Sequence, residues 1–68
     1  MEIPVISEFD GKKIRDIKFP ARAIIGVIQR RNKVIIPKGD TEIHTDDILI
    51  IFTTSENASQ IKGFFKIL

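Results

Sequence analysis

The first residues to consider are those whose side chains could carry out catalysis or hold a metal. His44 is the only histidine, and the chain has no cysteine. A metal site needs several convergent ligands, and a serine nucleophile needs an adjacent base. The serines at 7, 55 and 59 have no such base nearby in the sequence. The sequence therefore predicts no catalytic residue, no metal site and no enzymatic activity, with His44 as an exposed strand or loop residue.

Four acidic residues gather in the second half of the chain: Asp40, Glu42, Asp46 and Asp47. Their spacing lacks the glycine and the terminal glutamate of a calcium-binding loop. Aspartate is common in turns, because its side chain bonds to nearby backbone groups. We therefore interpret Asp40, Asp46 and Asp47 as turn residues rather than as a cation site.

Three basic residues, Arg30, Arg31 and Lys33, surround Asn32 in a predicted hairpin turn. Such a cluster could bind a phosphate, although a solvated hairpin tip is the favoured interpretation. A small basic β-rich nucleic-acid-binding domain is the alternative function. The net charge is only +2, and the chain has no Trp or Tyr for base stacking, so we expect no nucleic-acid partner.

Length and composition set the broad class. The 68 residues predict one domain over 1–68, and a chain this short has a marginal core. The absence of cysteine and of a signal peptide favours a cytoplasmic protein. The longest apolar runs, 23–28 and 48–52, fall well short of the ~20 residues of a membrane span, so no membrane insertion is expected.

The elements that must position these side chains are mainly strands. Ile and Val dominate 23–28, 34–36 and 48–52, and β-branched residues favour strands. We predict an α+β fold with a small, mostly antiparallel sheet and the order β-α-β-β-(β)-β-α. The predicted segments are an edge strand at 2–8, a short helix at 12–17, strands at 22–30, 33–37 and 48–54, a brief extended piece at 42–44 and a final helix from 55.

The central strands are apolar on both faces, so both faces of the sheet need a cover. The C-terminal helix, with Ile61, Phe64 and Phe65, can cover one face, and the short first helix offers only Ile14 and Ile17 for the other. A large uncovered apolar patch is unusual on a soluble monomer. We therefore predict a homodimer, with strand 22–30 and helix 11–18 near the two-fold axis.

The order of motifs around the hairpin resembles the TrkA-C domain, the C-terminal subdomain of RCK regulators of K⁺ transport. The matching residues are Arg30, an apolar pair, Pro37, Asp40-Thr41, and Asp47 before the apolar strand 48–52. The segment 11–17 also resembles the family's Gly-Lys start of a helix. The chain departs from the family by placing Asp46 where a glycine is usual.

The resemblance implies a non-enzymatic regulatory domain that senses a ligand or dimerises, within a potassium uptake system or channel. It also implies two partners outside this chain, a Rossmann-type RCK N-subdomain and a membrane K⁺ transporter or channel. The nucleotide-binding subdomain of the family would lie in that other part, because 1–68 contains no Gly-x-Gly-x-x-Gly. We therefore expect no cofactor in this domain, although a nucleotide-type regulatory ligand stays open.

Some family members bind a cyclic dinucleotide at the subunit interface, and their binding pattern can be aligned with 12–25. Asp16 matches the pattern's aspartate and Ile25 one of its aliphatic residues, whereas Lys18 replaces an arginine and Ile24 an asparagine. The candidate ligand-binding residues, in a groove at the dimer interface, are Asp16, Lys18, Ile24, Ile25, Arg30 and Pro37. Because the forked donor and the amide are missing, the alternative that Asp16 and Lys18 are only surface charges is favoured.

Overall fold

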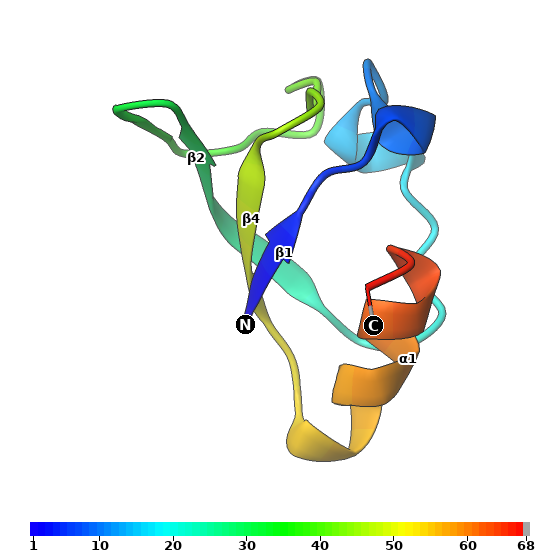
Figure 1. The fold of residues 1–68 in the computed structure, drawn as a ribbon. Helices are drawn as coiled ribbons and strands as arrows, with labels where there is room; N and C mark the ends of the chain where they lie inside the picture. The colour runs from blue at the N-terminus through cyan, green and yellow to red at the C-terminus, as the bar shows by residue number, and fades with distance from the viewer. Residues whose placement is uncertain (68) are drawn as a thin grey trace.

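The computed structural model describes residues 1–67 and contains one antiparallel sheet with one α-helix packed against it (Figure 1). The strands lie in the order β1-β4-β2-β3. Their bounds are Glu2–Pro4 for β1, Ile24–Arg30 for β2, Lys33–Ile35 for β3 and Ile48–Phe52 for β4. The helix α1 spans Ala58–Phe64, and three short 3-10 segments are η1 (Ser7–Phe9), η2 (Ile14–Asp16) and η3 (Ser55–Asn57). The predicted α+β class is confirmed.

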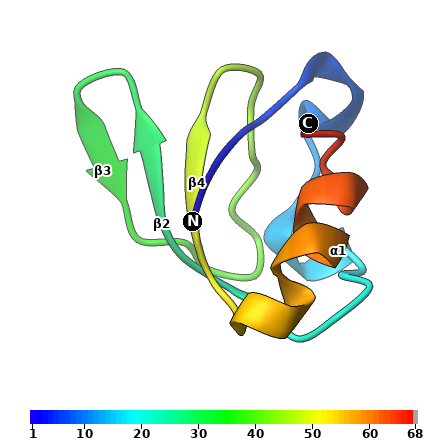
Figure 2. The same cartoon turned by 60° about the horizontal axis from the view of Figure 1, so that its bottom comes forward.

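The β2–β3 hairpin forms where the sequence predicts it. Arg30 pairs with Lys33 across a two-residue turn, and Arg31 adopts a left-handed conformation with φ 57°. Such turns suit hairpins because their twist matches that of the strands. The strand ends at Ile35 instead of reaching Pro37, which has no N–H to donate to a ladder. The hairpin places β3 at one edge of the sheet, beside β2 (Figure 2).

The first strand is shorter than predicted. It ends at Pro4, and the chain turns at η1 before reaching residue 10. Val5 still exchanges two backbone hydrogen bonds with the loop ahead of β4, from its N–H to the Asp47 carbonyl and from the Asp46 N–H to its own carbonyl. The turn then buries Phe9 in the core, which an extended strand to residue 8 would not do.

The helix predicted at 12–17 is wrong. Only the single 3-10 turn η2 forms, because the backbone of this segment bonds to a distant part of the chain. The N–H groups of Ile14 and Arg15 donate to the carbonyls of Thr41 and Gly39, at 2.9 Å each. The predicted extended piece at 42–44 is reduced to one bridge, between Lys13 and Glu42. A segment this short gains more from these bonds than from a helix of its own.

The core lies on one face of the sheet. Alternate residues of the strands point into it, and the same cluster contains residues of η1, η2 and α1. Its buried members are Ile3, Val5, Phe9, Ile17, Ile25, Ile28, Ile43, Leu49, Ile51, Ile61 and Phe65. The expectation that Ile14 and Ile17 could cover the opposite face is therefore wrong, because Ile17 is buried in this cluster and Ile14 packs against it. Figures 1 and 2 show α1 and the N-terminal segments on the same side of the sheet.

The C-terminal helix closes this core with aromatic side chains. Phe65, just after α1, is fully buried, and the rings of Phe9, Phe19 and Phe64 lie around it with centroid distances of 5.0 to 5.9 Å. Ile61 is buried as predicted, whereas Leu68 lies outside the described residues. Among residues 1–67, no helix has the length and apolar character needed to cross a membrane.

Candidate functional site

The polar centre of the molecule is a bidentate ion pair between Arg30 and Asp47. Gln29 of β2 pairs with Ile48 of β4 in an antiparallel register. Arg30 and Asp47, the next residues in this register, therefore lie opposite each other at this end of the sheet. The Arg30 Nε donates to Asp47 Oδ1 at 2.8 Å, and its Nη2 donates to Oδ2 at 2.7 Å. Nη2 also donates to the backbone carbonyl of Glu42 at 3.0 Å. Arg30 therefore joins the hairpin to both ends of the loop 42–47.

Asp47 is the one charged residue classed as buried among those described, with 2% of its surface exposed. Burial by itself raises the pKa of this carboxyl, but the Arg30 guanidinium and the His44 N–H, which donates to Oδ2 at 2.9 Å, outweigh it. The net effect is a lowered pKa, so Asp47 stays ionised at neutral pH. The pKa of Arg30 is raised, chiefly by its hydrogen bond to Asp47. Asp47 does more than form a turn, because its carboxylate accepts hydrogen bonds from Arg30 and from the His44 N–H.

The loop 44–47 is also tied to the first turn of the chain. The Thr45 N–H donates to Asp10 Oδ1 at 2.7 Å, and this bond is the main reason for the lowered pKa of Asp10. His44 is exposed, as predicted, with Nδ1 4.0 Å from Asp10 Oδ1 and Nε2 3.8 Å from Glu42 Oε1. Within the part of the chain that is described, no group of His, Asp and Glu side chains could hold a metal ion.

Asp46 occupies a backbone conformation that favours glycine, with φ 74°. This is the position where the TrkA-C pattern usually has glycine. We predict that Asp46→Gly stabilises the domain by about 0.5 to 1 kcal/mol, because glycine adopts positive φ without steric cost. Asp46→Ala should destabilise it instead. Urea unfolding of both variants tests this, and a stabilised alanine variant would contradict it.

An open hollow of about 730 Å³ lies between the hairpin tip and the loop 44–47. Its nine lining residues are Asp10, Arg30, Arg31, Asn32, Lys33, His44, Thr45, Asp46 and Asp47. The three basic and three acidic residues among them cancel in formal charge. Since Arg30 and Asp47 already satisfy each other, the hollow offers a mixed, exposed polar surface and no strongly charged site.

The second notable surface is the face of the sheet opposite the core. Phe52 and Ile24, which pair directly across β4 and β2, are 63% and 69% exposed. Val34 and Ile36, in and just after β3, are 65% and 70% exposed. Val27, Ile48 and Ile50 lie between them and are half-buried. We call the set Ile24, Val27, Val34, Ile36, Ile48, Ile50 and Phe52 the outer face.

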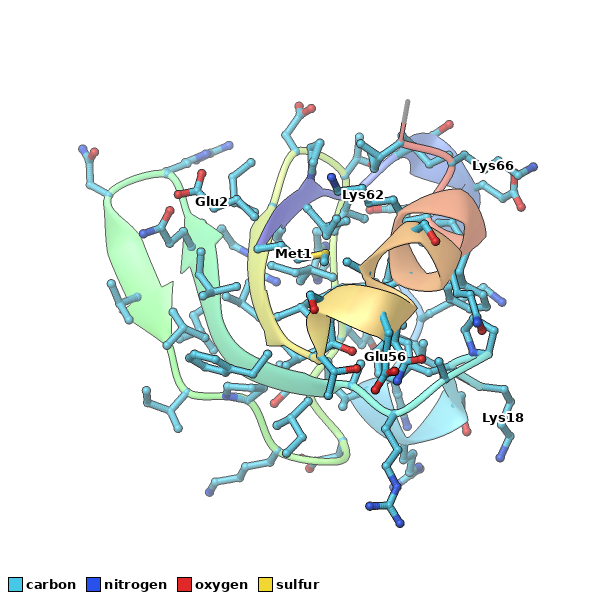
Figure 3. The ribbon with its side chains drawn as sticks, turned by 90° about the horizontal axis from the view of Figure 1, so that it is seen from below. Met1, Glu2, Lys18, Glu56, Lys62 and Lys66 are labelled. Carbon is cyan, nitrogen blue, oxygen red and sulfur yellow. The ribbon has the colours of Figure 1, made fainter. Side chains whose placement is uncertain are left out.

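The six predicted ligand-binding residues do not form one pocket within a single copy. Ile25 is buried in the core, and Arg30 forms an ion pair with Asp47. Asp16 and Lys18 are exposed at the end of η2, where Lys18 extends away from the molecule (Figure 3). The remaining two lie nearer the sheet, with Ile24 on the outer face and Pro37 half-buried after β3. Of the six, the hollow contains Arg30.

Two features of the site were not singled out from the sequence. The partnership of Arg30 and Asp47 follows from the strand register, which a bulge in β2 shifts by one residue. The sequence does contain a signal for this pair, because an arginine ends one predicted strand and an aspartate directly precedes another. The position of Phe52 on the outer face follows from alternation along β4, in which Leu49 and Ile51 are buried.

Comparison with known proteins agrees with this architecture. The model of the TrkA-C domain family matches residues 1–66. A Trk system potassium uptake protein TrkA homolog of Archaeoglobus fulgidus is 39% identical over 56 residues, which are 82% of this chain and 13% of that protein. TrkA homolog 1 of Methanosarcina mazei is 35% identical over 60 residues, or 88% of this chain and 13% of its own length.

A solved structure described as "Structure of RCK domain with cda" superposes with a TM-score of 0.86 at 27% identity. The superposition covers 96% of this chain and 94% of that one. The chain spans only about an eighth of the length of the curated relatives, and its fold is RCK-like. With a family match over 1–66 and relatives in the Trk potassium uptake system, the chain belongs to the TrkA-C domain family.

Proposed function

We propose that this chain is a non-catalytic regulatory domain of a potassium uptake system or channel. The observation that carries the proposal is the family match over 1–66, together with 39% identity to a TrkA homolog. Because the match covers a small part of the relatives, the domain would act with an RCK N-subdomain and a membrane transporter or channel, at the cytoplasmic side. Its regulatory mechanism would be dimerisation, ligand sensing or both.

The outer face supports the homodimer. It is an exposed, largely apolar side of a sheet whose opposite side is covered by α1, η1 and η2. The same side also carries Glu2 of β1, opposite Ile50, and Gln29 of β2, opposite Ile48. A second copy related by a two-fold axis would cover the apolar residues. We propose that the two-fold axis of this dimer lies near β2. Ile14 and Ile17 turn inward, so segment 11–18 would contribute the exposed Asp16 and Lys18.

A regulatory ligand would bind in a groove between two copies. Asp16, Lys18, Ile24 and Pro37 reach the surface, and a groove between copies would supply each of them twice. Ile25 would support this groove from within the core, and Arg30 would fix the hairpin beside it. The ligand class we propose is nucleotide-type.

We predict that cyclic dinucleotides bind weakly or not at all. Ile24 cannot hydrogen-bond a base as an asparagine amide does, and Lys18 lacks the arginine fork. Calorimetry with a cyclic dinucleotide should show no submicromolar binding. The matched variant Ile24→Asn, alone and with Lys18→Arg, should gain affinity. Submicromolar binding by the unmodified domain would contradict the prediction.

The function itself is tested by potassium uptake in cells. Disruption of the gene that encodes this chain should change net K⁺ uptake at low external K⁺, and the intact gene should restore it. Unchanged uptake in the disrupted strain, with the transport system expressed, would overturn the proposal.

A further inference from the structure

Asp10 and Gly11 form the only Asp-Gly pair in the sequence. In such a pair the backbone nitrogen of the glycine can attack the side-chain Cγ of the aspartic acid, because glycine has no side chain that hinders the approach. The new N–Cγ bond closes a five-membered imide, and the N–H proton leaves with a carboxyl OH as water. Water then reopens the imide at the former backbone carbonyl, which gives isoaspartate. The water released balances the water consumed, so the reaction needs no co-reactant.

The fold requires glycine at this position. Gly11 has φ 82°, in the left-handed region that other residues rarely adopt. A Cβ at Gly11 would meet no atom within 4 Å, so the requirement concerns the backbone and not space. The turn after η1 therefore depends on a chemically labile pair of residues.

Two hydrogen bonds hold the reacting groups of this pair apart. The Gly11 N–H donates to the carbonyl of Ile43 at 2.7 Å, and Asp10 Oδ1 accepts from the Thr45 N–H at 2.7 Å. The imide ring is nearly planar, so the attacking nitrogen must swing into the plane of the Asp10 side chain. The Asp10 ψ of 131° holds this nitrogen well outside that plane. Both bonds must therefore open before the ring can close.

The protonation state of Asp10 acts in the same direction. The attack proceeds on the neutral carboxylic acid, because a carboxylate is a poor electrophile. The pKa of Asp10 is lowered, chiefly by the backbone N–H of Thr45, so the folded protein has less of the reactive acid at a given pH. The side chain is 52% exposed, so exclusion of water does not protect it. Any protection comes from the hydrogen bonds.

We propose that Asp10 is a site of spontaneous conversion to isoaspartate, and that the folded domain suppresses this reaction through the bonds of Asp10 and Gly11 to the loop 42–47. Conversion would insert Cβ into the backbone ahead of Gly11 and displace both bonds. The modified chain would lose the tie between its first turn and the loop that carries Asp47. The chemistry depends on this chain alone and is independent of the proposed regulatory function.

The test compares the folded domain with a synthetic peptide of residues 1–13, which lacks the loop 42–47, during incubation at pH 6. Cleavage after Lys12 releases the peptide 1–12, in which Asp10 is the only aspartate, so chromatography and enzymatic methylation report isoaspartate at this residue. We expect isoaspartate to form more slowly in the folded domain by roughly tenfold or more, the effect of opening two hydrogen bonds. Equal rates would overturn the suppression, and a peptide that forms none would overturn the site.

A matched pair of variants tests the bond from Thr45. Thr45→Pro removes the N–H donor and should speed the reaction in the folded domain, whereas Thr45→Ser keeps the donor and should react like the wild type. Circular dichroism checks that both variants are folded. Hydrogen exchange of the wild type needs no variant: the amide protons of Gly11 and Thr45 should exchange more slowly than in a peptide without partners. Fast exchange of both, or a folded Thr45→Pro that reacts like the wild type, would overturn the assigned cause.

Discussion

Replacement of Arg30 by methionine is expected to destabilise the domain by about 3 to 5 kcal/mol at pH 7. The change removes the guanidinium that donates two hydrogen bonds to Asp47, and it leaves a carboxylate that is only 2% exposed. Desolvation of an unpaired charge is costly, whereas methionine keeps much of the packing of the arginine stem. Because a small domain has only a few kcal/mol of stability, this variant is expected to be close to unfolding.

The pH dependence of the same variant gives the more specific test. In the wild type the pKa of Asp47 is lowered on folding, so its ionised form adds stability above the unfolded value of about 3.9. That contribution is lost as the pH falls through the lower, folded pKa. In Arg30→Met, burial dominates and should raise the pKa of Asp47 above its unfolded value. The loss of unfolding free energy caused by Arg30→Met should then become smaller as the pH falls from 7 towards 4, because the carboxyl of Asp47 binds a proton.

The matched variant is Asp47→Asn, which removes the charge but keeps one acceptor for the His44 N–H. We expect this variant to lose about 1.5 to 3 kcal/mol of unfolding free energy at pH 7, which is typical of a hydrogen bond to a charged group. Its unfolding free energy should also depend less on pH in the acid range than that of the wild type. Urea unfolding of the three proteins at pH 7 and pH 4 measures these differences. Losses below about 0.5 kcal/mol in both variants, the range of exposed pairs, would show that the pair contributes little.

The second large effect concerns the outer face. Introducing a charge with Ile24→Asp should abolish self-association at micromolar concentration, since a two-fold axis would bring two buried, unpaired carboxylates together. The fold should persist, because Ile24 is 69% exposed and lies outside the core. The carboxylate would stand opposite the exposed ring of Phe52. Light scattering on the wild type and the variant gives the two masses.

Ser59→Asp on α1 is the control for this change. It adds the same charge at an exposed position on the covered side of the sheet. We expect it to dimerise like the wild type. If Ile24→Asp and Ser59→Asp have the same mass as a dimeric wild type, another surface forms the contact.

Much of the fold could be predicted because it is encoded locally. β-Branched runs gave the three main strands, Asn32 marked the hairpin turn, and Ile61 and Phe65 marked the buried side of the C-terminal helix. The resemblance to TrkA-C domains, drawn from the order of Arg30, Pro37 and Asp47, was confirmed by the family match. These signals depend on side-chain type and short spacing, which a sequence displays directly.

What the sequence did not display depends on distant contacts. The segment 12–17 has a helical apolar spacing, yet Ile14 and Arg15 donate to carbonyls more than 20 residues away. The pairing of Arg30 with Asp47 requires the strand register, and the bulge at Gly26 shifts that register by one residue. The two-sided apolar strands correctly indicated an uncovered face, but not that η2 would join α1 on the covered one.

Potassium uptake by cells that carry Ile24→Asp at the natural locus tests the central claim most directly. If this chain regulates a potassium transport system through its outer face, the variant protein should be as abundant as the wild type and should change K⁺ uptake at low external K⁺ in the same direction as disruption of the gene. Ser59→Asp should leave uptake unchanged. Uptake in the Ile24→Asp strain equal to wild type, with the variant protein present and monomeric, would contradict the claim.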